Sequence, residues 1–167
     1  IVLPILAVSF CHALEVVFTA RRWASHHSAS SDEAHQSLVN ILFRLSGMNM
    51  SALVIAAVVG FLAVLLSTAA LFAGGLWAEL VWTTVFMAYS VCALINLVRA
   101  VTLKGYVPGL VTSIISVPLI AYAAYSLSLV WPWWEMLLFA ILGLVLALAN
   151  LYFAQRIGRY STTEVCV

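Results

Sequence analysis

The sequence has 167 residues, of which 65% are hydrophobic and 8% are charged, and its formal net charge is +1. Its mean hydropathy is +1.14. A soluble domain of this size exposes too much surface to water for so apolar a composition, so the sequence predicts an integral membrane protein. It has no basic surface of the kind that binds nucleic acid, and we expect no nucleic-acid partner.

Five apolar segments are each long enough to cross a membrane, which takes about 20 residues of helix. We therefore expect an all-α bundle of five transmembrane helices that forms a single transmembrane domain. The predicted spans are residues 1–20, 50–73, 78–103, 109–130 and 133–155. A four-span alternative would fuse the last two segments into one helix with Pro132 inside it, and proline disrupts helix interiors.

The first segment differs from a removable signal peptide. It lacks a basic start and a small-residue cleavage site, and it contains His12 and Glu15. We therefore expect it to remain as the first span.

The loop of residues 21–49 contains the one long polar stretch of the sequence. Ser30 and Glu33 have the spacing of a capping box, and apolar residues recur at helical spacing as far as Leu45. This pattern predicts a short amphipathic helix on the inner membrane surface. The histidines of the loop do not match a zinc-binding pattern, and we expect no metal site there.

The basic residues predict how the chain is oriented in the membrane. They follow the first, third and fifth segments and are absent from the turns at 74–75 and 131–132. The positive-inside rule then places the N-terminus outside and the C-terminus in the cytoplasm, and we expect a prokaryotic plasma membrane. Tryptophans at the uncharged ends predict an aromatic belt on the outer face. They are Trp77, Trp82, Trp131, Trp133 and Trp134.

Polar side chains recur at similar depth inside the spans. His12 and Glu15 share one face of the first helix, and Asn96 and Arg99 repeat that spacing in the third. With a rise of about 1.5 Å per residue, Glu15 and Arg99 lie at one level, and His12 and Asn96 lie about one turn deeper. The fourth and fifth spans add Thr112, Ser113, Ser116 and Asn150 to this layer.

A charge near the middle of a span costs about 2.5–3.5 kcal/mol on insertion scales, so these groups should meet each other rather than lipid. We expect a Glu15–Arg99 ion pair inside a polar network. A purely structural pair, or an Arg99 side chain that reaches back to the surface, stays open. The candidate site residues are His12, Glu15, Asn96, Arg99, Thr112 and Asn150.

Two parts of the chain resemble a known family. The segment His12-Ala-Leu-Glu15-Val16 resembles the motif that names the HXXEE-domain membrane family. The residues from Asn96 to Arg99, followed by Tyr106-Val-Pro-Gly and Thr112, resemble the second signature of that family, which has a His, a basic residue, Tyr-x-Pro-Gly and a Thr. The resemblance covers most of residues 1–125.

The chain departs from the family pattern at two positions. Val16 stands where the second acid is expected, and Asn96 where the second His is expected. If the family binds a metal with these groups, His12 and Glu15 alone are too few for a zinc or di-iron site. The resemblance implies no settled activity.

Several functions remain compatible with these residues. We expect a non-enzymatic accessory or assembly subunit that packs against another membrane protein or against itself, because the chain is small and carries stripes of small residues. These stripes are Ala52, Ala56 and Gly60 in the second span and Gly143 and Ala147 in the fifth. One alternative is a small enzyme acting on an isoprenoid or other lipid. In this enzyme His12 would transfer a proton, and Glu15 would orient His12 or stabilise its charge. Another is a cofactor- or ligand-binding membrane protein, whose cofactor the sequence does not identify. The single span histidine, His12, excludes a bis-histidine haem within one protomer.

Overall fold

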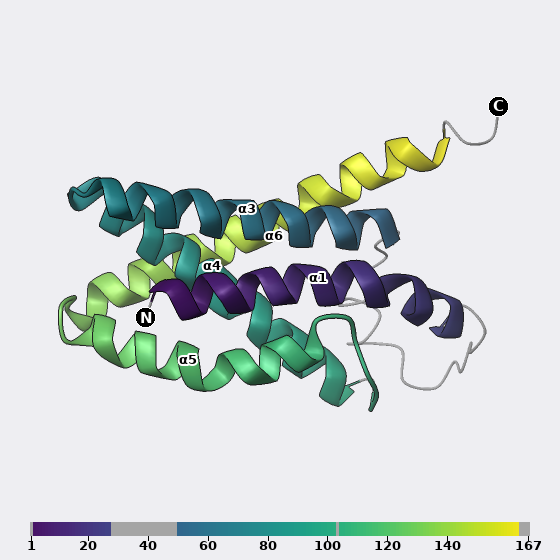
Figure 1. Ribbon diagram of the computed structural model, residues 1–167, viewed down its shortest axis with the longest axis horizontal. Coiled ribbons are helices and arrows are strands. Elements are labelled where there is room, and N and C mark those ends of the chain that lie inside the picture. The colour runs from purple at the N-terminus through teal and green to yellow at the C-terminus, as the bar shows by residue number, and fades with distance from the viewer. Residues whose placement is uncertain (1, 28–49, 103, 164–167) are drawn as a thin grey trace.

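The structure, a computed structural model, describes residues 2–27, 50–102 and 104–163. These residues form five α-helices and no strand (Figure 1). The helices are α1 (Val2–His27), α3 (Met50–Ala73), α4 (Leu76–Thr102), α5 (Leu110–Ser128) and α6 (Trp133–Thr163).

Each of the five helices is long and apolar enough to cross a membrane. The predicted all-α membrane bundle is thereby confirmed. α1 and α6 continue past their apolar parts, to His27 and Thr163, because helical hydrogen bonding does not stop where the hydropathy falls. The loop predicted from residue 21 therefore starts as helix. The predicted amphipathic helix lies outside the described residues.

The helices are layered so that α1 and α4 each contact several neighbours. α1 packs against α3 and α5, whereas α4 packs against α3, α5 and α6, and α3 also contacts α6 (Figure 1). A buried cluster holds α1, α3, α4 and α5 together near one end of the bundle. Its members are Ile5, Val64, Trp82, Phe86 and Ala123.

Trp82 belongs to this cluster and not to the predicted aromatic belt. Its side chain is only 6% exposed, stacks on Phe86 and donates its indole N–H to the hydroxyl of Thr68 at 3.3 Å. A polar partner on α3 makes burial of the indole favourable, because a buried N–H needs an acceptor. Trp77 and Trp133, by contrast, are exposed as predicted for a belt.

The small-residue stripes are used inside the bundle. A Cβ added at Gly143 of α6 would lie 2.7 Å from the backbone nitrogen of Ala88 on α4, so the two helices cross at very short range. Ala52 and Ala56 of α3 form a buried cluster with Ala154 of α6. These stripes therefore join helices of one chain to each other.

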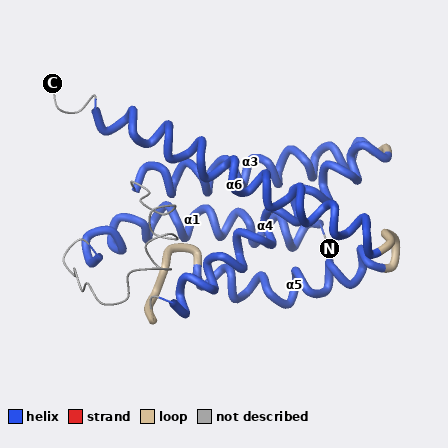
Figure 2. Tube along the Cα trace, turned by 180° about the vertical axis from the view of Figure 1, so that it is seen from behind, coloured by secondary structure: helices blue, strands red, loops and turns tan. Residues whose placement is uncertain are grey.

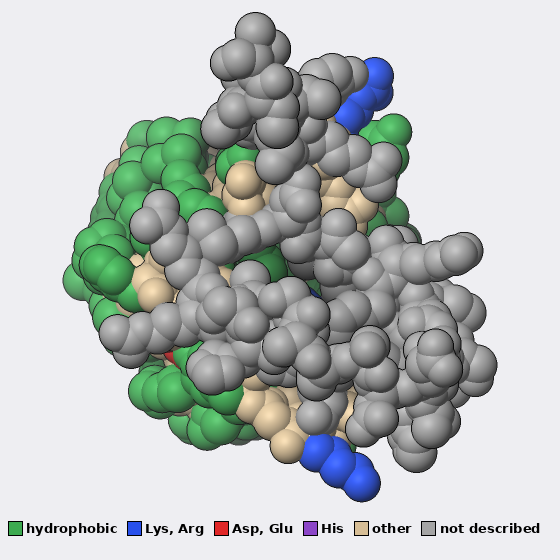
Figure 3. Space-filling view, turned by 90° about the vertical axis from the view of Figure 1, so that its right-hand side faces the viewer, with side chains coloured by type: hydrophobic (Ala, Val, Ile, Leu, Met, Phe, Trp, Pro, Cys, Tyr) green, Lys and Arg blue, Asp and Glu red, His purple; other side chains and the backbone are tan. Residues whose placement is uncertain are grey.

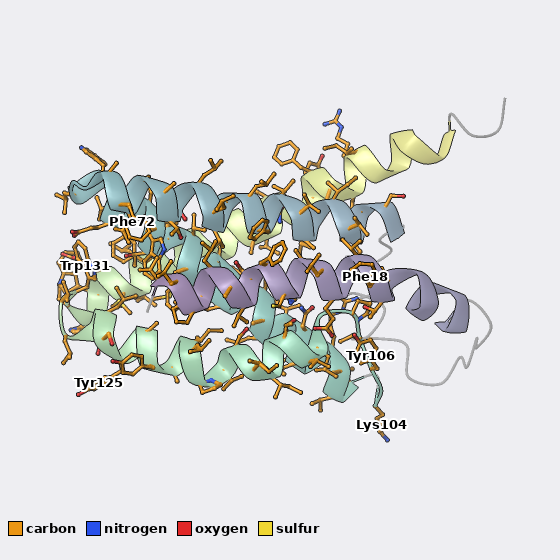
Figure 4. All side chains as sticks on the ribbon, viewed as in Figure 1. Phe18, Phe72, Lys104, Tyr106, Tyr125 and Trp131 are labelled. Carbon is orange, nitrogen blue, oxygen red and sulfur yellow. The ribbon has the colours of Figure 1, made fainter. Side chains whose placement is uncertain are left out.

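The two ends of the bundle differ in character. Phe72, Tyr125 and Trp131 lie at one end, and Tyr106 and Lys104 lie at the other (Figure 4). Figure 3 looks onto the second end and shows basic side chains at its rim and hydrophobic side chains along its flank. This division suits a bundle that crosses a bilayer, while the predicted N-out orientation stays a prediction.

Candidate functional site

The start of α5 is the structural centre of the site. Figure 2 shows the loop that connects α4 to α5. It enters α5 through Gly109, whose φ of 86° is left-handed and which gives the helix no side-chain cap. The amide of Leu110 donates to the carbonyl of Val107 at 3.0 Å. The next two amides, of Val111 and Thr112, have no partner on their own helix, as is usual in a first turn.

Glu15 of α1 supplies the missing acceptor. Val111 N–H donates to Glu15 Oε1 at 3.1 Å, and Thr112 N–H donates to Oε2 at 2.9 Å. A carboxylate at this position satisfies two amides and also meets the positive end of the helix dipole. Glu15 therefore caps a helix that begins almost a hundred residues later in the chain.

Two hydroxyls complete the environment of the carboxylate. Tyr106 Oη donates to Glu15 Oε1 at 2.6 Å, and Thr112 Oγ1 donates to Oε2 at 2.7 Å. Partial burial and the hydrogen bond to Glu15 raise the pKa of the Tyr106 phenol, so this hydroxyl stays protonated and keeps its donor role. Four donors thus surround one carboxylate, which stabilises its charged form at the edge of the spans.

His12 is linked to Glu15 through Thr112. Its Nδ1 lies 2.8 Å from Thr112 Oγ1. The Thr112 hydroxyl has one proton, and Glu15 Oε2 at 2.7 Å is a nearer acceptor than the Gly109 carbonyl at 3.2 Å, so we assign His12 Nδ1 as the donor in this contact. A neutral His12 therefore carries its proton on Nδ1 and keeps Nε2 as an acceptor.

Gly109 is required at its position for a second reason. A Cβ on this residue would lie 2.4 Å from His12 Cε1 and 3.2 Å from Asn96 Nδ2. The absence of a side chain lets the α5 entry lie directly against both groups. Gly109 thus lies against His12 and Asn96, one residue from each of the two parts of the chain that carry the family resemblance.

Side chains of α4 contact α5 one turn further along. Asn96 Nδ2 donates to Ser113 Oγ at 3.4 Å, and the hydroxyls of Tyr89 and Ser116 are 2.6 Å apart. The Tyr89 ring also meets His12 edge-on, with ring centroids 6.2 Å apart. These contacts place His12, Asn96 and Tyr89 around one space.

That space is a cavity of about 170 Å³ between α1, α3, α4 and α6. Its walls are largely apolar. The polar side chains that line it are Ser9, His12, Tyr89, Asn96, Arg99 and Asn150. Asn150 Nδ2 donates to the Ala56 carbonyl at 3.0 Å, so this hydrogen bond to α3 holds the Asn150 amide in place.

Arg99 differs from the prediction. Its side chain is 9% exposed and lines the cavity. Among the described residues, Glu15 bonds to Tyr106, Val111 and Thr112 rather than to Arg99, and no described residue pairs with the guanidinium. The predicted Glu15–Arg99 ion pair is therefore not formed.

The predicted site residues thus fall into two groups. His12, Asn96, Arg99 and Asn150 surround the cavity, whereas Glu15 and Thr112 lie at the α1–α5 junction. The sequence reasoning missed Tyr106 as a partner of Glu15. The signal that could have identified Tyr106 is its position just before Gly109, where α5 begins without a side-chain cap. Within the described residues, no three His, Cys, Asp or Glu side chains gather as a metal site.

Comparisons with known proteins give the family of the chain. No curated protein and no solved structure matches it. A family model described as a protein of unknown function with HXXEE motif matches residues 3–123, which include both α1 and the start of α5. The match covers more than half of the 167 residues. This chain therefore belongs to the HXXEE family.

Proposed function

We propose that this membrane protein binds a largely apolar molecule inside the bilayer, in the cavity between α1, α3, α4 and α6. The observation that carries the proposal is a largely apolar cavity of about 170 Å³ into which polar side chains from α1, α4 and α6 converge. Ligand sites combine apolar walls with a few placed polar groups in this way. An apolar protein cavity of about 150 Å³ can already hold a molecule the size of benzene.

The accessory-subunit function has less support. Its motive was the small-residue stripes, but Gly143, Ala52 and Ala56 pack within the bundle. It stays a prediction, and a protein that co-purifies at fixed stoichiometry from mild detergent would favour it over ligand binding.

An enzymatic role has one specific observation in its favour. The chain of hydrogen bonds from Glu15 through Thr112 orients His12, which lines the cavity. A histidine with a set tautomer can exchange a proton with a bound molecule. This version requires that the wild-type protein converts its bound molecule into a different compound, which can be an isomer of the same mass, and that the His12→Gln variant does not.

Native mass spectrometry of the protein released from its own membrane tests ligand binding. The informative variant is Ala57→Leu, because Ala57 lines the cavity and a leucine there occupies part of it. The matched control is Ala121→Leu, at an exposed position of α5. We expect wild type and Ala121→Leu to retain an apolar molecule at one copy per chain and Ala57→Leu to lose it. Equal retention by both variants, or none by wild type, would overturn the proposal.

A further inference from the structure

The charge of Arg99 is the feature of the cavity that needs explanation. Its guanidinium is enclosed, at 9% exposure, among largely apolar walls. Within the described part of the chain it has no hydrogen bond or ion pair. Burial of an unpaired cation is costly, so such groups usually have a partner that is paired and hydrogen-bonded.

Glu15 lies between the cavity-lining residues His12 and Val16 in the sequence, but its carboxylate already has hydrogen-bond partners. Glu15 accepts four hydrogen bonds from Tyr106, Val111 and Thr112, and it does not line the cavity. Its charge is neutralised by the α5 N-terminus rather than by Arg99. No Asp or Glu is among the described residues that line the cavity.

Val16 stands where the HXXEE motif has its second acid, and it lines the same cavity as Arg99. Its side chain is 2% exposed. A glutamate at this position would put a carboxylate into the cavity. With valine there, Arg99 has the only full charge among the described residues that line the cavity.

We propose that the ligand of this cavity is a single-chain amphiphile with an anionic head, a carboxylate or a phosphate, which binds to Arg99. The inference rests on the proposed ligand binding and adds the chemical class of the ligand. Arg is well suited to both heads, because its planar guanidinium donates two parallel hydrogen bonds to an oxyanion. Asn96 and His12 line the same space. The volume admits a head and a short apolar stretch and excludes a whole diacyl lipid.

Three probes that each contain twelve carbons separate the contribution of charge to binding from that of hydrophobicity. They are dodecanoate, dodecyl phosphate and dodecan-1-ol. Purified protein in a non-ionic detergent is titrated with each probe, and binding is followed by native mass spectrometry. We expect at least one of the two anions to bind wild type about tenfold or more tighter than the alcohol, as a charge-assisted hydrogen bond allows. The better anion identifies the head as carboxylate or phosphate. Equal binding of all three probes would overturn the inference.

The Arg99→Gln variant should bind the anion no better than the alcohol. Arg156→Gln is the matched control, because Arg156 is exposed on α6 and the change in charge is the same. It should keep the wild-type preference. Arg99→Gln should also fold, since it removes a buried unpaired charge. An unchanged preference in Arg99→Gln would contradict the role of Arg99.

A second pair of variants, at Val16, tests whether an acid inside the cavity can replace the ligand as the partner of Arg99. Val16→Glu should pair with Arg99 and remove the anion preference, whereas Val16→Gln, which has the same size, should keep it. If Val16→Glu does not fold, the Arg99→Gln result decides.

The Ala57→Leu variant separates the two proposals. If it weakens all three probes but anions are not preferred, ligand binding stands and the inference fails. If it weakens none, ligand binding itself fails.

Discussion

Thr112 gives the Glu15 carboxylate two of its four donors. Its backbone N–H and its hydroxyl both reach Glu15 Oε2, at 2.9 and 2.7 Å. One threonine on α5 therefore joins the helix cap to the contact with His12. The α1–α5 junction behaves as one hydrogen-bonded unit, and its members can be tested separately.

Replacement of Glu15 by glutamine should destabilise the protein. The amide keeps one acceptor oxygen but loses the charge, so Val111, Thr112 and Tyr106 lose part of their partner. Loss of hydrogen bonds to a charged group costs about 1.5–3 kcal/mol. Thermal unfolding in detergent measures the effect. Glu79→Gln, the same change at an exposed position in the first turn of α4, should cost less than about 1 kcal/mol. Similar losses in both variants would contradict the capping role of Glu15.

The Gly109→Ala variant should be more destabilised than Gly74→Ala. Both glycines have positive φ, 86° and 83°, so alanine adds a similar backbone strain of about 1–2 kcal/mol at each. Only at Gly109 would the new Cβ also meet His12, at 2.4 Å, whereas nothing lies within 4 Å at Gly74. The extra cost of Gly109→Ala should be about 1 kcal/mol or more in thermal unfolding.

A double-mutant cycle assigns that extra cost to its cause. Adding His12→Ala to Gly109→Ala removes the clash, so the double variant should lose less stability than the sum of the single variants. Strict additivity would show that Gly109 is constrained by its backbone alone.

Thr112→Val should disturb His12, while Thr112→Ser should not. Valine has nearly the shape of threonine but has no hydroxyl, so Glu15 Oε2 loses a donor and His12 Nδ1 loses its acceptor. We expect Thr112→Val to be destabilised by about 1–3 kcal/mol. Nitrogen NMR of labelled histidine should show the Nδ1–H tautomer in wild type and Thr112→Ser and a mixture in Thr112→Val. The same tautomer in all three proteins would contradict the hydrogen-bond chain.

The Tyr106–Glu15 hydrogen bond should make stability depend on alkaline pH. Because the pKa of Tyr106 is raised in the folded state, its stabilisation is complete below the unfolded-state value of about 10 and is lost as the pH rises through the folded-state value. Tyr106→Phe lacks the hydroxyl. The difference in melting temperature between wild type and Tyr106→Phe should therefore be constant near neutral pH and shrink above pH 10.

Tyr125→Phe is the control for that measurement, since Tyr125 is exposed at the opposite end of the bundle (Figure 4). Its melting temperature should follow wild type across the pH range. A wild-type advantage over Tyr106→Phe that persists unchanged at high pH would show that the phenol contributes by packing and not by donation to Glu15.

The sequence by itself determined the five apolar helices and the depth of the polar residues. Helix length and hydropathy are local properties, so the spans could be counted from composition alone. The rise per residue is constant, which is why His12, Asn96, Thr112 and Asn150 could be assigned to one layer.

Only the tertiary structure decided which of these residues meet. Depth does not specify which helix faces which, so opposite charge alone suggested Glu15 and Arg99 as partners. In the bundle, α1 packs against α5, and the uncapped amides of Val111 and Thr112 take the carboxylate instead. The burial of Trp82 has the same origin, because its acceptor, Thr68, lies on another helix. Arg99 is left facing the cavity, and the chemistry proposed for this protein follows from that arrangement.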